Sequence, residues 1–71
     1  MSTYDKVKEV LSEFTVKVVE PTSTFSTLKL DSLDTMEIVI ELESIFDIEL
    51  DEDALPNTIQ ELVSLIDSQL N

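Results

Sequence analysis

The stretch of sequence that decides the fold reads DSLDTMEIVIELESIF and runs from Asp31 to Phe46. It contains neither Gly nor Pro, so nothing in it interrupts a helix. Asp31 can accept hydrogen bonds from the free amides of a first helical turn, and Asp34 adds a second carboxylate at the positive end of the helix, as in a capping box. The stretch therefore predicts a long helix in which Ser32 is the first residue.

The apolar residues of this predicted helix fall on two arcs when successive residues are placed about 100° apart. The wider arc is expected to face the core and consists of Thr35, Ile38, Val39, Leu42, Ile45 and Phe46. The narrower arc combines three apolar residues with three flanking acids, namely Leu33, Met36 and Ile40 with Glu37, Glu43 and Asp47. An exposed apolar patch ringed by carboxylates, beside a serine, predicts a docking surface with a modifiable group at its edge.

Three further helices are predicted in the flanking sequence. Ser2 or Thr3 can cap a first helix, whose apolar face is formed by Val7, Val10, Leu11 and Phe14. A short helix is expected over residues 51–55, capped by Asp51 and ended by Pro56. A capping box of Thr58 and Glu61 opens the last helix, whose buried face is expected to hold Ile59, Leu62, Val63, Ile66 and Leu70. The predicted fold is all-α, a small four-helix bundle with one short third helix.

The segments between these helices are expected to be extended or to cover the core. Residues 16–18, Val-Lys-Val, alternate as in a strand, but the rest of the chain offers them no partner strand. Phe25, Leu28 and Leu30 are expected to turn inward and hold this connection over the core. After the long helix, Ile48 and Leu50 are expected to close the core from another side.

Length and composition limit the kinds of protein this chain can be. Its 71 residues predict one domain, residues 1–71. The chain has no Cys and no His, which removes thiol chemistry, the commonest general base and the commonest metal ligands. It has no Gly either, so the acidic run at residues 51–53 cannot belong to a calcium-binding EF-hand. We therefore expect a protein that is not an enzyme and holds no metal.

The charge balance indicates which partners to expect. The formal net charge is −12, with Asp and Glu outnumbering Lys and Arg by 16 to 4. Such a chain is repelled by nucleic acid and by anionic membranes, and it is attracted to proteins with basic patches. No stretch is long and apolar enough to span a bilayer, and the N-terminus lacks the apolar core of a signal peptide. We expect a monomer in the cytoplasm.

The long predicted helix also carries a family resemblance. The sequence Asp31-Ser32-Leu33-Asp34, followed by residues 36–39, Met-Glu-Ile-Val, and an acidic and apolar run to Phe46, resembles the attachment-site helix of acyl carrier proteins. The likeness extends to residues 25–28, Phe-Ser-Thr-Leu, and to residues 58–62, Thr-Ile-Gln-Glu-Leu. It implies a four-helix bundle of acyl-carrier type. It also implies a covalent 4′-phosphopantetheine on Ser32, flanked by Asp31 and Leu33.

The same resemblance implies partners and a role. A phosphopantetheinyl transferase would load Ser32, and fatty acid or polyketide synthesis enzymes would dock on a surface at Leu33, Met36, Glu37, Ile40 and Glu43. Part of the bound acyl chain would lie in the apolar interior. The candidate lining residues, which can equally be ordinary core residues, are Phe25, Leu42, Ile45, Ile59 and Leu62. The alternatives are an aminoacyl or peptidyl carrier and an acidic helical adaptor without a prosthetic group. An enzyme comes third.

Two departures from the family pattern are visible. The residue two before Asp31, often Gly in acyl carrier proteins, is Lys29 here, which puts a cation and a stiffer backbone beside the attachment serine. Ser44 and Ile45 stand at positions that are commonly acidic in the family. The acidic face is therefore thinner toward the end of the helix.

Overall fold

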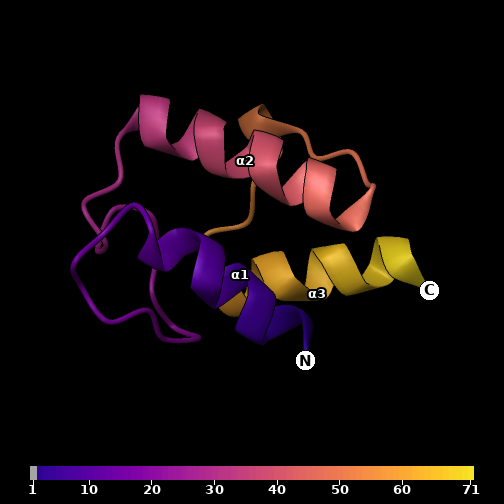
Figure 1. Ribbon diagram of the computed structural model, residues 1–71, viewed down its shortest axis with the longest axis horizontal. Coiled ribbons are helices and arrows are strands. Elements are labelled where there is room, and N and C mark those ends of the chain that lie inside the picture. Colours follow the sequence, from indigo (N-terminus) through magenta and orange to yellow (C-terminus); the bar gives the residue numbers. More distant parts are fainter. Residues whose placement is uncertain (1) are drawn as a thin grey trace.

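The computed structural model describes residues 2–71 and contains, within them, three α-helices and one 3₁₀ turn (Figure 1). These are α1 at Thr3–Ser12, α2 at Ser32–Phe46, η1 at Glu52–Ala54 and α3 at Ile59–Leu70. The β-type pairing in the same residues is an isolated antiparallel bridge between Thr24 and Thr58. The all-α prediction is confirmed, and the predicted short third helix is a single 3₁₀ turn capped by Asp51.

The three α-helices begin where their capping boxes predict. In each of them the side chain of the N-cap residue accepts a hydrogen bond from the amide three residues on, and the acid at that position reaches back to the cap amide. The pairs are Ser2 with Asp5, Asp31 with Asp34, and Thr58 with Glu61. Side chains thus replace the missing backbone partners of the first turns, which explains why the start of each helix is readable from sequence.

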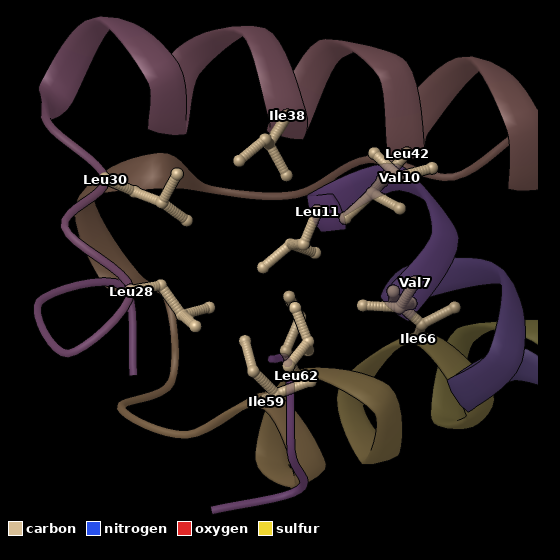
Figure 2. Close-up of a cluster of buried hydrophobic side chains, with 11 residues drawn as sticks. Val7, Val10, Leu11, Leu28, Leu30, Ile38, Leu42, Ile59, Leu62 and Ile66 are labelled. Atoms are coloured by element: carbon tan, nitrogen blue, oxygen red, sulfur yellow. The ribbon is translucent and has the colours of Figure 1, made fainter. Parts of the chain in front are cut away.

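The core lies where α1, α2 and α3 meet (Figure 2). Helix α1 packs against both other helices, and Figure 2 shows α2 side chains pointing toward those of α1 and α3. Leu28 and Leu30, from the chain leading into α2, close one end of the core. In the described part of the chain, all the deeply buried residues are apolar: Val7, Val10, Leu11, Val19, Leu28, Leu30, Ile38, Val39, Leu42, Ile59, Leu62 and Ile66.

The long connection between α1 and α2 is held by hydrogen bonds to α1 and α3 and by hydrogen bonds within itself. The Tyr4 hydroxyl donates to the Val19 carbonyl at 3.4 Å, and the Thr15 hydroxyl donates to the Leu28 carbonyl at 3.0 Å. Between these anchors Val16 and Val18 project into solvent, with exposed fractions of 104% and 75%. As expected, their strand-like alternation finds no partner strand in residues 2–71.

Two residues predicted to be buried are exposed. Ile45 is 40% exposed and Leu70 is 47% exposed. Both lie in the last turn of their helix, and in Figure 1 these ends of α2 and α3 extend beyond α1. Periodicity places a residue on the correct face of a helix, but it does not show where the opposing helix stops. Ile45 is therefore removed from the candidate interior lining, whereas Leu42, Ile59 and Leu62 lie in the core.

Candidate functional site

Ser32 occupies the first position of α2, at the solvent-exposed start of the helix. The Asp34 amide donates to Asp31 Oδ1 at 2.8 Å, and the Asp31 amide donates to Asp34 Oδ2 at 3.4 Å. The Thr35 hydroxyl in turn donates to the Asp31 carbonyl at 2.8 Å. Because the two aspartates form the cap, the Ser32 hydroxyl is not used to hold the helix together. It remains accessible to an enzyme that would modify it.

The chain enters this site through a helical turn that ends in a left-handed residue. The Leu30 amide donates to the Phe25 carbonyl at 2.9 Å, and the Lys29 amide donates to the Ser26 carbonyl at 3.1 Å. These two bonds form a Schellman motif, in which the residue just after the helix cap, the donor of the second bond, takes a positive φ. That residue is Lys29, with φ of 61°. The motif explains why glycine would suit this position, and it holds the lysine at the surface three residues before Ser32.

An open depression of about 560 Å³ lies beside Ser32, between the first turns of α2 and η1. It is lined by Ser32, Leu33, Thr35, Met36, Glu52 and Asp53. A second depression, of about 610 Å³, shares three of its lining residues with the first and continues to Phe25, Leu55 and Pro56. The two depressions thus adjoin, and together they offer a flexible group on Ser32 an open surface with apolar and acidic sides. The hydroxyl, its exposure and this surface fit a covalent phosphopantetheine.

The exposed apolar patch predicted on α2 is present. Leu33 is 58% exposed, Met36 is 40% exposed and Ile40 is 59% exposed. We call these three residues the α2 patch. Glu37 beside it is exposed, and so is Asp47 at the far end of the helix. Because α2 also supplies Ile38 and Leu42 to the core, it has one buried and one exposed apolar face.

Glu43 differs from the expectation of an exposed acid at the rim of the patch. It is half-buried, and its Oε2 accepts a 2.8 Å hydrogen bond from the Leu50 amide. Glu41 and Asp34 are half-buried as well. The Leu50 amide needs a hydrogen-bond acceptor, and the Glu43 carboxylate provides it instead of pointing into solvent. Helix periodicity does not predict a hydrogen bond to a segment outside the helix.

The structure also adds residues that the sequence did not single out. Glu52 and Asp53 line the first depression together with Ser32, and Thr35 lines both depressions. Glu52 and Asp53 reach the site only through the packing of η1 against α2. Their position in the sequence contains no signal for this, because the loop between α2 and η1 determines where they lie.

Residues 2–71 contain neither a membrane-spanning helix nor a cluster of metal ligands. No helix in this part of the chain has the length and apolar character needed to cross a membrane. In the same residues, no three acidic side chains come together in an arrangement that could hold a metal ion.

Comparison with known proteins matches the chain to one family. Residues 4–66 match the family described as "Phosphopantetheine attachment site". The chain is 47% identical over 68 residues to acyl carrier protein 1, chloroplastic, of Spinacia oleracea, covering 93% of this chain and 49% of the spinach protein. It therefore spans about half the length of that relative.

Bacterial relatives are matched over nearly their whole length. The chain is 32% identical over 72 residues to the acyl carrier protein of Streptococcus pyogenes serotype M3, with 97% of each chain covered. It is 33% identical to that of Streptococcus pneumoniae serotype 4, with the same coverage. The chain therefore belongs to the acyl carrier protein family, and its cofactor is a covalently attached 4′-phosphopantetheine.

Proposed function

We propose that the chain carries acyl groups as thioesters on a 4′-phosphopantetheine attached to Ser32, and hands them to fatty acid or polyketide synthesis enzymes. The observation that carries this proposal is the position of Ser32. It is exposed at the first position of α2, its neighbours Asp31 and Asp34 cap the helix, and an open depression lies beside it. When bound, the cofactor would supply a terminal thiol that holds the acyl group.

In this proposal Ser32 is an acceptor and the chain is not an enzyme. A phosphopantetheinyl transferase would join Ser32 Oγ to the phosphorus of coenzyme A that bears the pantetheine, and 3′,5′-adenosine diphosphate would leave. The serine proton would pass to a base of the transferase, because this chain has no His to receive it. Asp31 and Leu33 flank the acceptor: Asp31 holds the start of the helix, and Leu33 lines the adjoining depression.

The docking surface for transferase and synthesis enzymes would be the α2 patch with its acidic rim. Leu33, Met36 and Ile40 supply exposed apolar area, while Glu37 and Asp47 supply negative charge. Together with the net charge of −12, this arrangement favours partners with basic patches. Rim charges of this kind mainly raise the rate of association and make it sensitive to salt. Glu43 would contribute to docking only if its carboxylate released the Leu50 amide and bound a cationic side chain of the partner.

The arm and the first part of its cargo would lie along the two adjoining depressions. Phe25, one of the predicted lining residues, borders the second depression and is half-buried. Leu42, Ile59 and Leu62 belong to the packed core, so an acyl chain would reach them only if α2 moved away from α1 or α3. A single domain, a monomeric state and a cytoplasmic location stay predictions.

The attachment site can be tested by intact mass. The protein, its Ser32→Ala variant and a Ser44→Ala control would be incubated with coenzyme A, Mg²⁺ and a broad-specificity phosphopantetheinyl transferase. Ser44 is a matched control because it is an exposed serine on the same helix. We expect one phosphopantetheinyl addition on the protein and on the control, and none on Ser32→Ala. Addition to Ser32→Ala, or none on any of the three folded proteins, would contradict the proposal.

A further inference from the structure

Lys29 is an exposed cation three positions before Ser32 in the sequence, and within residues 2–71 it forms no ion pair. The four cationic side chains of the chain are Lys6, Lys8, Lys17 and Lys29. Within residues 2–71 the ion pair of the structure joins Lys6 to Glu9 in α1, and Lys29 forms none. Lys29 is exposed, and in the Schellman motif its own amide donates to the Ser26 carbonyl while the next amide, that of Leu30, donates to the Phe25 carbonyl. Its charge is therefore free to interact with a new anion nearby.

The surroundings of Ser32 are otherwise acidic. Asp31 and Asp34 form the helix cap around it, and Glu52 and Asp53 line the first depression with it. The partial positive charge at the start of α2 is already used by the two capping aspartates. A phosphodiester on Ser32 would add another negative charge to this cluster. Among the lysines, Lys29 is the nearest along the chain.

We propose that Lys29 is the counter-charge of the phosphodiester through which the prosthetic group is attached to Ser32; this inference rests on the proposed function. Ser32 follows Lys29 by three positions, so their Cα atoms lie at most about 10 Å apart. The long flexible stem of a lysine can bridge much of that span.

The first test compares the effect of modification on thermal stability. The protein, Lys29→Gln, Lys29→Arg and the control Lys17→Gln would be melted before and after phosphopantetheinylation, at low salt. Lys17→Gln removes the same charge from an exposed position in the connection between α1 and α2. Modification should lower the melting temperature of Lys29→Gln by about 2 °C more than that of the protein, Lys29→Arg or Lys17→Gln. The difference should disappear in about 0.5 M salt, where the Debye length is only a few ångströms.

A second readout reports on the phosphodiester itself. Its ³¹P resonance in the folded, modified protein should shift in Lys29→Gln and stay unchanged in Lys17→Gln, and the variants should coincide in urea. Equal melting shifts together with superimposable ³¹P spectra would overturn the inference while the proposed function stands. Intact mass distinguishes failure of this inference from failure of the proposed function. If no phosphopantetheinyl group is added, both are overturned.

Discussion

The Oε2 atom of Glu43 accepts a 2.8 Å hydrogen bond from the backbone amide of Leu50, which follows it by seven residues. The Ile48 amide also donates to the Glu43 carbonyl, at 3.2 Å, and Asp47 between them has a positive φ of 55°. One residue therefore ends α2 with its backbone and holds the following segment with its side chain. Family resemblance assigns Glu43 to the docking surface, but its carboxylate already has a structural partner.

Replacing Glu43 should therefore destabilise the fold. Glu43→Ala leaves the half-buried Leu50 amide without its acceptor, and we expect a loss of about 1–2 kcal/mol in the free energy of unfolding. Urea denaturation followed by circular dichroism would measure it. The control is Glu37→Ala on the exposed face of the same helix, which should change stability by no more than about 0.5 kcal/mol. Equal losses of stability in the two variants would show that the hydrogen bond from the Leu50 amide to Glu43 does not stabilise the fold.

Lys29→Gly should stabilise the protein before modification. A non-glycine residue at φ of 61° carries a backbone cost that glycine avoids. Part of this gain is offset by the greater freedom of glycine in the unfolded chain, so we expect a net increase of about 0.5–1 kcal/mol. Urea midpoints would report it. Lys29→Ala removes the same side-chain charge but keeps the backbone cost, so a comparable gain in that variant would contradict this explanation.

The two apolar faces of α2 should respond differently to truncation. Leu42 is fully buried, so Leu42→Ala should cost about 3 kcal/mol through lost burial and the cavity left behind. Ile40 is 59% exposed, so Ile40→Ala should change stability by no more than about 0.5 kcal/mol. Urea denaturation would measure both, and the rate of phosphopantetheinylation would report on docking. We expect Ile40→Ala to slow the transferase while leaving the fold intact. A large loss of stability in Ile40→Ala would mean that this side chain is part of the core.

Salt should raise the melting temperature. The net charge of −12 is confined to a molecule measuring 30 × 23 × 19 Å. At 10 mM ionic strength the Debye length is about 30 Å, so the acids repel one another across the whole molecule, whereas near 0.2 M it is only about 7 Å. We expect a rise of roughly 5 °C between these conditions, measured by circular dichroism, and Mg²⁺ should act at lower concentration. A flat or falling melting temperature would exclude this charge repulsion as a significant term.

Local hydrogen bonding explains which features were predictable. The capping boxes at Ser2, Asp31 and Thr58 involve residues three apart, so the starts of α1, α2 and α3 could be read directly from the chain. The exposed α2 patch was predictable for a related reason, because the 3.6-residue period separates two faces of one helix. Its assignment to docking stays a prediction.

Features that depend on distant segments were not predictable. The exposure of Ile45 and Leu70 follows from where α1 begins relative to the last turns of α2 and α3 (Figure 1), and the partial burial of Glu43 follows from the position of the Leu50 amide. The same reason applies to the reduction of the short third helix to one 3₁₀ turn, since its few residues are held by their surroundings more than by helix propensity.

By itself, the sequence of this protein determined the helices, their starting points, the two faces of α2 and the position of Ser32 at the head of that helix. These depend on bonds and periods that span only a few residues. Tertiary structure alone decided that η1 would bring Glu52 and Asp53 to the depression beside Ser32, and that the Glu43 carboxylate would accept from the Leu50 amide. Such arrangements depend on how loops close over a shared core, and no local pattern encodes that geometry.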